Sequence, residues 1–234
     1  MTIKPITIAI DGPSGSGKSS VSKEVARRLE LGYLDTGAMY RAATWWCLRE
    51  GVELTDADSV TAVVDTMPLS MSTNPDDQTI RLDDVNITEI IRETNISSKV
   101  SAVATNLEVR DILRRMQRAR IEAERTGGFS RGNGIVAEGR DITTVVAPDA
   151  DVRILLVASE EARLARRAKD VHGVADAQAV EATKDEVLRR DADDSTVSSF
   201  QVAADGVVTI DSSDLDFEQT VAAVLQVVEN VTGN

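Results

Sequence analysis

Cysteine, histidine and long apolar runs are scarce in this sequence, and each scarcity excludes a class of protein. The one cysteine, Cys47, cannot form an intramolecular disulfide, and with a single histidine it cannot complete a zinc site. We interpret Cys47 as a small core residue and expect a reduced, cytoplasmic protein. No apolar run approaches the ~18–20 residues that span a bilayer, and no signal peptide precedes the first expected strand. We therefore expect no membrane partner.

Positive charge is scarce as well. The chain carries 26 Lys and Arg residues against 39 Asp and Glu residues, which gives a formal net charge of −13. A nucleic-acid surface needs a basic face, so we expect no nucleic acid among the partners. Repeats, low-complexity segments and long linkers are also missing. The 234 residues are enough for one sizeable α/β domain, or for a core with one small insert.

Residues 12–19 read G-P-S-G-S-G-K-S and match the phosphate-binding pattern G-x-x-x-x-G-K-[ST]. The glycines allow successive backbone N–H groups to turn toward a phosphate, and the lysine supplies a positive charge to the β- and γ-phosphates. The last hydroxyl, that of Ser19, can ligate Mg²⁺. The predicted phosphate-binding residues are Gly12, Pro13, Ser14, Gly15, Ser16, Gly17, Lys18, Ser19 and Ser20.

The neighbouring residues give this loop the context that it needs. Residues 6–10 are apolar and β-branched, as in a buried strand, and Val21, Val25, Ala26 and Leu29 share one face at helical spacing. A helix that begins where the loop ends directs its dipole at an anion. The order of strand, loop and helix therefore predicts a true phosphate site. Because the chain is acidic overall, we expect arginines to gather positive charge around it.

Strand-like and helix-like segments alternate along the rest of the chain. Residues 68–72 and 79–82 resemble an antiparallel pair around a turn. We expect further strands at residues 134–138, 152–158 and 207–210, and helices at residues 18–30, 38–50, 56–65, 97–125, 159–171, 176–190 and from 217 onward. This order predicts an α/β fold, a mostly parallel sheet with helices on both faces and a small antiparallel insert. Residues 35–37 and 139–141 follow strands, so they should meet the phosphate loop at one edge of the sheet.

Four further segments carry a resemblance to a known family. They read D-T-G-A-M-Y-R at residues 35–41, S-A-V-A-T-N-L-E-V-R at 101–110, E-G-R-D at 138–141 and R-D-A-D-D-S-T at 190–196. With the phosphate loop, they make nearly the full chain strongly resemble cytidylate kinase, the bacterial type of nucleoside monophosphate kinase. The resemblance implies the P-loop kinase fold in a single domain with a short helical lid. Its expected parts are a core at residues 1–65, 97–168 and 192–234, an acceptor-binding insert at about 66–96 and the lid at about 169–191.

The same resemblance implies an activity and the residues that perform it. A cytidylate kinase transfers the γ-phosphoryl group of ATP to CMP or dCMP, so ATP with Mg²⁺ and CMP or dCMP are the expected ligands, bound by a monomer. The residues of the phosphate loop become the predicted ATP-binding residues. The predicted catalytic residues are Lys18, Arg140 and Arg190. The predicted substrate-binding residues are Thr36, Arg41, Ser101, Arg110, Arg140, Asp141, Arg190 and Asp194.

Two positions depart from the pattern of that family. Val197 stands where a further arginine is usual, which removes one phosphate contact. Thr143 stands where glycine is usual, so we expect the backbone after Asp141 to differ slightly. The candidates to replace the missing arginine are Arg166, Arg167 and Arg189.

Arg110 begins a run of arginines on one predicted helix. Only Arg110 has a position that suggests a function, and we expect most of the others to form a solvated helix face. These others are Arg114, Arg115, Arg118 and Arg120.

Two other interpretations stay open. A kinase for another small acceptor, such as UMP, AMP or shikimate, would share the fold and the loop, and the fold alone does not separate these activities. A nucleotide switch that acts through a partner belongs to a different class, and its guanine-specific form should carry an N-K-x-D motif, which the sequence lacks. The segments at residues 35–41 and 138–141 favour the cytidylate acceptor.

Overall fold

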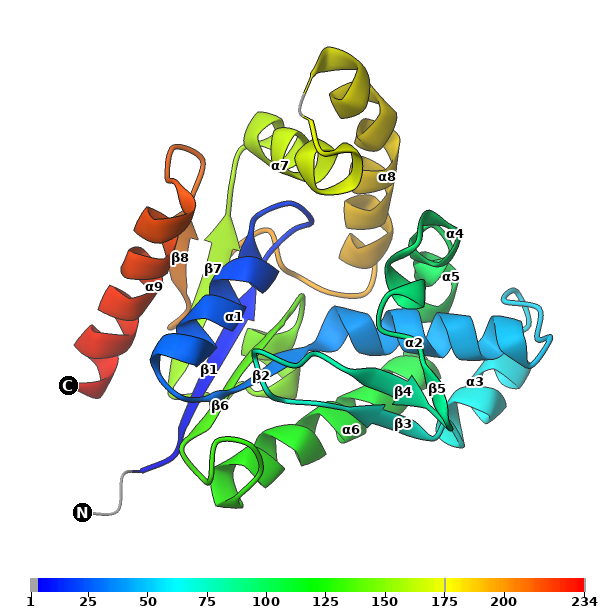
Figure 1. Ribbon diagram of the computed structural model, residues 1–234, viewed down its shortest axis with the longest axis horizontal. Helices are drawn as coiled ribbons and strands as arrows, with labels where there is room; N and C mark the ends of the chain where they lie inside the picture. The colour runs from blue at the N-terminus through cyan, green and yellow to red at the C-terminus, as the bar shows by residue number, and fades with distance from the viewer. Residues whose placement is uncertain (1–3, 175, 234) are drawn as a thin grey trace.

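The computed structural model describes residues 4–174 and 176–233, and a parallel sheet forms its centre. Within these residues the sheet has five strands, all parallel (Figure 1). Their order across the sheet is β2 (Gly32–Asp35), β6 (Gly134–Gly139), β1 (Ile6–Asp11), β7 (Val152–Val157) and β8 (Val208–Asp211). The central strand β1 has later strands on both sides, and ligands bind beyond the carboxyl ends of the strands at such a switch point.

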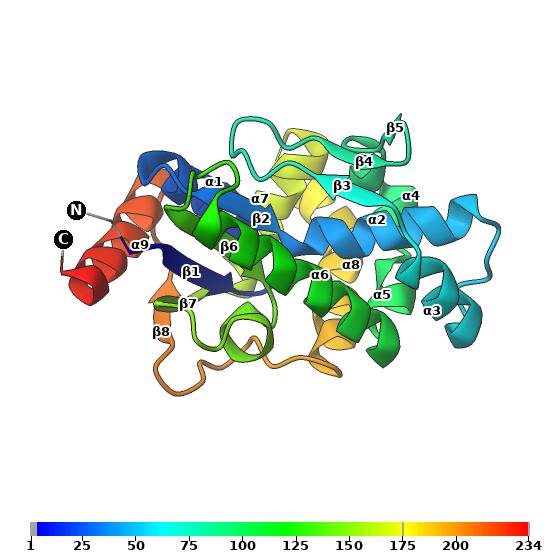
Figure 2. The same cartoon turned by 90° about the horizontal axis from the view of Figure 1, so that it is seen from below.

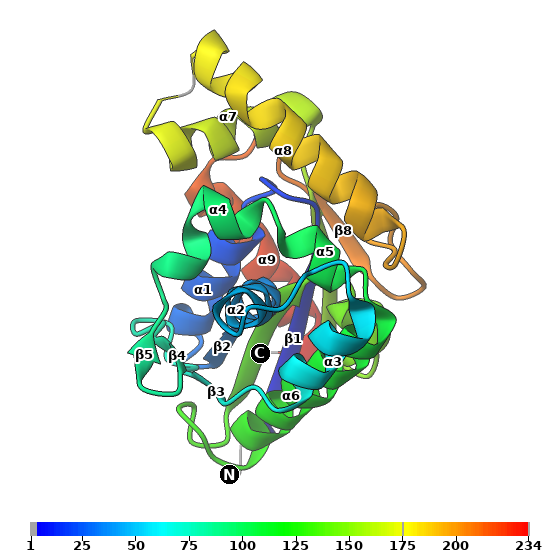
Figure 3. The same cartoon turned by 90° about the vertical axis from the view of Figure 1, so that its right-hand side faces the viewer.

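Helices cover both faces of the sheet. On one face lie α1 (Lys18–Arg28) and α9 (Phe217–Thr232), and on the other lie α2 (Thr36–Arg49) and α6 (Leu107–Thr126), with α3 (Ala57–Asp65) packed against α6 (Figures 2 and 3). Side chains of a strand alternate between the faces, so Ile8 and Ile10 join the core under α1, whereas Ala9 joins the core under α2. Cys47 is fully buried in the second core, as predicted. The predicted α/β fold is confirmed.

A small antiparallel sheet follows α3, also as predicted. It consists, in the described part of the chain, of β3 (Leu69–Met71), β4 (Ile80–Leu82) and β5 (Val85–Asn86). Ile80 and Leu82 are buried in the same core as α2, so this sheet is packed onto the main body. The short helices η1 (Ile90–Arg92), α4 (Thr94–Ser97) and α5 (Val100–Ala104) connect it to α6.

The helical region expected at residues 97–125 is present, and it consists of the end of α4, then α5 and α6, with short breaks between them. The break before α6 lies at Asn106, which has an extended backbone and caps α6: its side-chain oxygen accepts hydrogen bonds from the N–H groups of Glu108 and Val109. An asparagine side chain in this position competes with helix continuation. The break separates α5 from α6, which runs along the main sheet (Figure 3), so that its first turn brings Arg110 to the cavity described below.

The helices α7 (Glu160–His172) and α8 (Ala177–Ser195) pack against each other beyond the carboxyl ends of the strands (Figure 1). The helix expected to end at residue 190 continues to Ser195, so Asp191 and Asp194 lie on α8 one turn apart. The π-helical turn η2 (Ile142–Val146) follows β6. No described helix is both long and apolar enough to cross a membrane.

Candidate functional site

The phosphate loop connects β1 to α1 and depends on its glycines. A Cβ atom on Gly12 would lie 2.2 Å from the carbonyl oxygen of Leu156, and one on Gly15 would lie 2.5 Å from that of Arg163. Gly15 and Gly17 also have positive φ angles, +77° and +87°, which a side chain would strain. Packing therefore excludes a side chain at Gly12 and Gly15, and backbone conformation disfavours one at Gly15 and Gly17.

Lys18 and Ser19 begin α1 and face the end of β6. Lys18 Nζ donates a hydrogen bond to the carbonyl oxygen of Pro13 at 3.3 Å. Ser19 Oγ donates to Glu138 Oε1 at 2.7 Å, and the hydroxyl of Tyr33 donates to the same oxygen at 3.3 Å. Glu138, which is 2% exposed, therefore brings a buried carboxyl group to the hydroxyl that was predicted to ligate Mg²⁺.

Opposing effects act on the pKa of the Glu138 carboxyl group. Burial raises the pKa of Glu138 to about 7, and the negative charge of Asp35 adds to this effect, while Lys18 and the hydrogen bond from Ser19 oppose it. A cation beside a carboxyl group favours its charged form. A metal ion at this position would therefore lower the pKa of Glu138 again.

The segment after β2 turns directly into α2 and presents charged side chains to the same space. Asp35 caps α2 by accepting from the N–H of Ala38 at 2.8 Å, and it pairs with Arg41 Nη2 at 2.9 Å. Burial raises the pKa of Asp35, but Arg41 and the Ala38 N–H outweigh it and hold this pKa below its usual value. Thr36 Oγ1 donates to the carbonyl oxygen of Glu138 at 2.8 Å, which fixes the start of α2 to β6.

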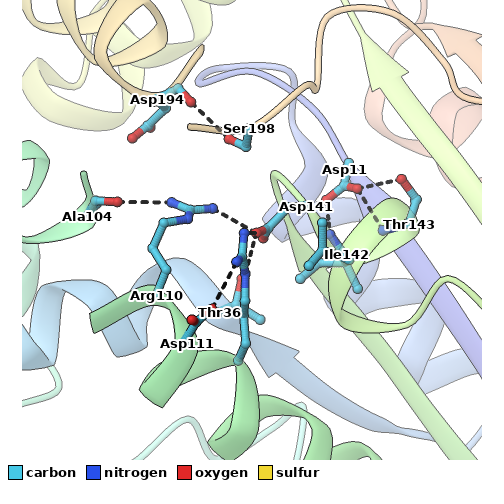
Figure 4. Close-up of polar contacts among 12 residues, drawn as sticks. Asp11, Thr36, Ala104, Arg110, Asp111, Asp141, Ile142, Thr143, Asp194 and Ser198 are labelled. Atoms are coloured by element: carbon cyan, nitrogen blue, oxygen red, sulfur yellow. Dashed lines mark hydrogen bonds and ion pairs between the residues drawn. The ribbon is translucent and has the colours of Figure 1, made fainter. Parts of the chain in front are cut away.

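Asp141 joins two arginines of α6 (Figure 4). Its Oδ2 accepts from Arg110 Nη2 at 2.7 Å and from Arg114 Nη2 at 2.8 Å. Arg110 also donates to the carbonyl oxygen of Ala104 at 3.0 Å, and its guanidinium lies 5.5 Å from the centre of the Tyr40 ring. The side chain of Arg110 is only 4% exposed, so these contacts offset the desolvation of its charge.

The arginine run of α6 is only in part the solvated face that the sequence suggested. That expectation is wrong for Arg114, which pairs with Asp141, and for the half-buried Arg120, which donates to carbonyl oxygens of β3. It holds for Arg115, whose side chain is 67% exposed, and for the exposed Arg118, which donates to carbonyl oxygens of η2. Sequence spacing could not separate these cases, because the partners come from other elements.

Arg140 points toward the opposite side, to α8. Its Nη1 lies 2.9 Å from Asp191 Oδ1 and 2.9 Å from Asp194 Oδ2, and its guanidinium lies 4.6 Å from the centre of the Phe200 ring. Arg140 and its neighbour Asp141 therefore make ion pairs with different helices on either side of the cavity.

Asp191 connects α8 to the phosphate loop as well. Its Oδ1 accepts from the N–H of Ser14 at 3.1 Å, and its Oδ2 pairs with Arg163 on α7. Arg163 in turn donates to the carbonyl oxygen of Ser14 at 2.9 Å, so both sides of one loop residue are held. This contact of α7 and α8 with the loop was not predicted.

One cavity of about 210 Å³ brings most of the predicted residues together. Those that line it are Ser14, Gly15, Gly17, Lys18, Ser19, Ser20, Thr36, Arg41, Arg110, Arg140, Asp141 and Asp194. Gly12, Pro13 and Ser16 belong to the loop but do not line the cavity, and Ser101 lies on α5 between the lining residues Val100 and Ala104 without lining the cavity itself. Arg190 lies on α8, and its side chain is outside the part of the chain that the structure describes.

Because Val197 stands where an arginine was expected, another arginine would have to make the missing phosphate contact. Of the three candidates to replace it, Arg167 lines the cavity, Arg166 donates to the carbonyl oxygen of Ser16 at 3.3 Å, and Arg189 is exposed. Arg167 is thus the candidate whose position suits a ligand, and Arg166 is a support of the loop.

Sequence reasoning missed several residues of this site. Glu138 lies two residues before Arg140, and Asp191 directly follows Arg190. A carboxyl group at a strand end beside a phosphate loop is a signal that could have singled out Glu138. Asp191 and Arg163 carried no such signal, because only the packing of α7 and α8 brings them to the loop. Among the described residues, no group of three or more His, Cys, Asp and Glu side chains is placed to hold a metal ion.

A parallel α/β fold with a phosphate loop at its switch point and an arginine-rich wall opposite defines a P-loop kinase. The model of the cytidylate kinase family matches residues 8–230. The chain belongs to the cytidylate kinase family.

Curated relatives agree with this assignment over nearly their full length. A cytidylate kinase of Streptomyces avermitilis is 44% identical, with 97% of this chain and 94% of that protein covered. One of Cutibacterium acnes is 44% identical, with 97% of this chain and 98% of that protein covered. One of Nocardia farcinica is also 44% identical, with 96% of this chain and 94% of that protein covered.

Proposed function

We propose that this chain transfers the γ-phosphoryl group of ATP to the phosphate of CMP or dCMP and releases ADP with CDP or dCDP. Membership of the cytidylate kinase family supports the reaction. The observation that carries it is the composition of one cavity, where the phosphate loop forms one wall and Arg41, Arg110 and Arg140 come from other elements. Two anionic groups can be bound there side by side.

The donor phosphates are assigned to the loop and the start of α1. Backbone N–H groups at the N-terminus of α1, together with its dipole, favour an anion, and Lys18 adds a full positive charge. These groups are fixed before the reaction, so they stabilise charge that shifts between phosphate oxygens without having to reorganise.

The donor set beside the loop also fits Mg²⁺. Mg²⁺ prefers oxygen ligands and usually accompanies nucleotide phosphates with one or two protein groups. Ser19 Oγ and the carboxyl group of Glu138 lie in hydrogen-bond contact at 2.7 Å, so a serine hydroxyl and a carboxylate are available together. We assign these two residues to the metal, which would neutralise charge on the donor phosphates.

The acceptor side needs no general base. The second pKa of a phosphate monoester is ~6, so the attacking oxygen of CMP is largely ionised near neutral pH. The difficulty is to hold two anions together, and arginine suits this task because its planar guanidinium can grip a phosphate through two N–H groups. We assign Arg41, Arg110 and Arg140 to the acceptor phosphate, and Thr36, Asp141 and Asp194 to positions around the nucleotide.

For Arg190 and Ser101 we propose the roles that the family resemblance implies, in binding phosphate and the acceptor base, respectively. Arg190 lies on α8 next to Asp191, which contacts the loop, and we assign it to the phosphates and to the exclusion of water, which otherwise hydrolyses ATP. Ser101 lies on α5 beside the cavity and would reach the base of the acceptor through a small shift of that helix.

Initial rates of ADP formation with a panel of acceptors test the function. At matched concentrations we expect CMP and dCMP to be phosphorylated far faster than UMP, AMP or shikimate. A preference for AMP or shikimate would contradict the acceptor assignment while leaving the donor loop intact. ATP hydrolysis that no acceptor stimulates would instead favour a nucleotide switch.

A further inference from the structure

A carboxylate directly before the phosphate loop connects the loop with the acceptor side of the cavity. Asp11 ends β1, and Gly12 follows it. Asp11 Oδ1 accepts from the N–H of Ile142 at 2.9 Å, and Oδ2 accepts from the N–H and the hydroxyl of Thr143 at 2.8 Å and 2.6 Å (Figure 4). Asp11 is 1% exposed and Thr143 4%, so these bonds are shielded from water.

We propose that Asp11 and Thr143 are positioning residues for the acceptor, because their hydrogen bonds fix the turn that carries Arg140 and Asp141. The inference rests on the proposed function, which assigns the acceptor to this side of the cavity. Neither residue lines the cavity, so both act through the turn.

The turn needs such an anchor because its two functional side chains form ion pairs with helices on different sides of the cavity. Arg140 is held by Asp191 and Asp194 on α8, whereas Asp141 is held by Arg110 and Arg114 on α6. These helices lie on different sides of the cavity, and their ion pairs leave the orientation of the backbone between the two residues open. Asp11 holds that backbone from the centre of the sheet, which is the least mobile part of such a fold. A displacement of about 1 Å at a reacting centre is enough to reduce a rate ~100-fold.

Thr143 supplies one hydrogen bond that a glycine at this position could not. With glycine, the Asp11 carboxylate would accept only the two N–H groups, and a buried carboxylate needs donors to remain charged. The residue that departs from the family pattern is therefore the one that completes the anchor.

The charges around Asp11 set the pH at which the anchor weakens. Burial raises the pKa of Asp11 to about 6, the hydrogen bonds of Thr143 and Ile142 oppose this, and the negative charge of Asp141 adds to it. The cations that face this turn contact other groups: Arg114 pairs with Asp141, Arg118 donates to carbonyl oxygens of η2 and Arg153 donates to that of Thr143. Protonation of Asp11 below this pKa removes an acceptor oxygen from the turn.

The test compares Thr143→Val, which keeps the shape but removes the hydroxyl, with Thr143→Ser, which keeps the hydroxyl. We expect Thr143→Val to raise the KM for CMP about 10-fold with the KM for ATP changed by less than about twofold. Thr143→Ser should remain within about twofold of the wild type in both constants. Thermal unfolding of each variant establishes that the compared proteins are folded.

The pH profile gives a readout that loss of stability alone would not move. Loss of the hydroxyl removes a hydrogen bond to the charged form, so the pKa of Asp11 rises and the acid limb of kcat/KM for CMP moves up by about one pH unit in Thr143→Val. The phosphate of CMP itself titrates at ~6. Because this titration is common to all variants, the difference between Thr143→Val and Thr143→Ser reports on Asp11.

Three results would overturn the inference while leaving the proposed function in place. They are a Thr143→Val enzyme with unchanged KM for CMP and unchanged pH profile, a variant that only unfolds at lower temperature, and equal losses in Thr143→Val and Thr143→Ser. A wild-type protein that does not phosphorylate CMP would overturn the proposed function and the inference together.

Discussion

The two walls of the cavity are held in place by different means. The donor wall is one continuous segment, residues 12–20, and its shape depends on glycines that lie against the backbone of β7 and α7. The acceptor wall is assembled from α2, α6 and the turn after β6. Each of its arginines is held by a carboxylate: Arg41 by Asp35, Arg110 by Asp141, and Arg140 by Asp191 and Asp194.

This difference explains how a protein with a net charge of −13 can bind two polyanions. On the donor side, backbone N–H groups and a helix dipole supply attraction, and the half-buried Lys18 adds a full positive charge. On the acceptor side, the carboxylates hold partly buried guanidinium groups that would otherwise lose too much hydration energy. The acidic residues near the site therefore position its positive charge.

The largest expected effect lies in the donor wall. Lys18→Met removes the charge that meets the donor phosphates, and we expect kcat to fall by at least ~10³-fold with the fold intact by circular dichroism. Lys4→Met is the matched control, because Lys4 is 80% exposed and pairs with Asp151 at the other end of the sheet. Full activity of Lys18→Met would refute the loop assignment.

The next largest effect should distinguish the acceptor wall from the donor wall. Arg140→Ala removes a charge-assisted contact to the acceptor, so we expect the KM for CMP to rise ~10- to 100-fold and that for ATP to change by less than about threefold. Steady-state kinetics with each nucleotide varied in turn measures both constants. Arg115→Ala, at an exposed site of α6, should change neither, and equal increases for CMP and ATP in Arg140→Ala would argue against its acceptor role.

Replacement of a loop glycine by alanine tests the packing of the donor wall without changing its charge. In Gly12→Ala the new methyl group meets the carbonyl oxygen of Leu156, so we expect kcat/KM for ATP to fall about 10-fold and the free energy of unfolding to fall by about 1–3 kcal/mol. Gly51→Ala provides the control. Gly51 has φ of +73° with open space around it, so its substitution should destabilise the fold by about 1 kcal/mol through strain and leave activity unchanged. Similar activity losses in both variants would contradict a specific role of loop packing.

The smallest of these effects concerns the residue that touches both walls. Asp191→Asn weakens the contacts to Ser14, Arg163 and Arg140 together, so we expect the KM values for both nucleotides to rise modestly, ~3- to 5-fold. Asp193→Asn, on the same helix and without an ion-pair partner among the described residues, should behave like the wild type. An effect of Asp191→Asn on CMP alone would show that it supports only Arg140.

The donor wall could be predicted in detail because its determinants are local. Residues 6–29 contain the strand, the loop and the helix, and periodicity together with the glycines defined all three. The alternation of later segments also predicted the parallel sheet and the antiparallel insert. The break at Asn106 was missed, because apolar spacing continues across it and only a side-chain cap reveals the new helix.

The supports of both walls could not be predicted, because they connect distant parts of the chain. Ser19 and Glu138 are 119 residues apart, and Ser14 and Asp191 are 177 residues apart. No local pattern distinguishes a carboxylate that will meet the loop from one that stays in water, and the same holds for Arg114 against Arg115. Such contacts depend on how α6, α7 and α8 pack on the sheet, and packing is a property of the whole fold.

Equilibrium binding of each nucleotide tests the separation of the two walls most directly. Isothermal titration of the wild type, Lys18→Met and Arg140→Ala with ATP and Mg²⁺, and separately with CMP, would give the affinities without turnover. We predict that Lys18→Met loses affinity for ATP but keeps its affinity for CMP. Arg140→Ala should lose affinity for CMP but keep its affinity for ATP. Parallel losses of both nucleotides in both variants would contradict the account.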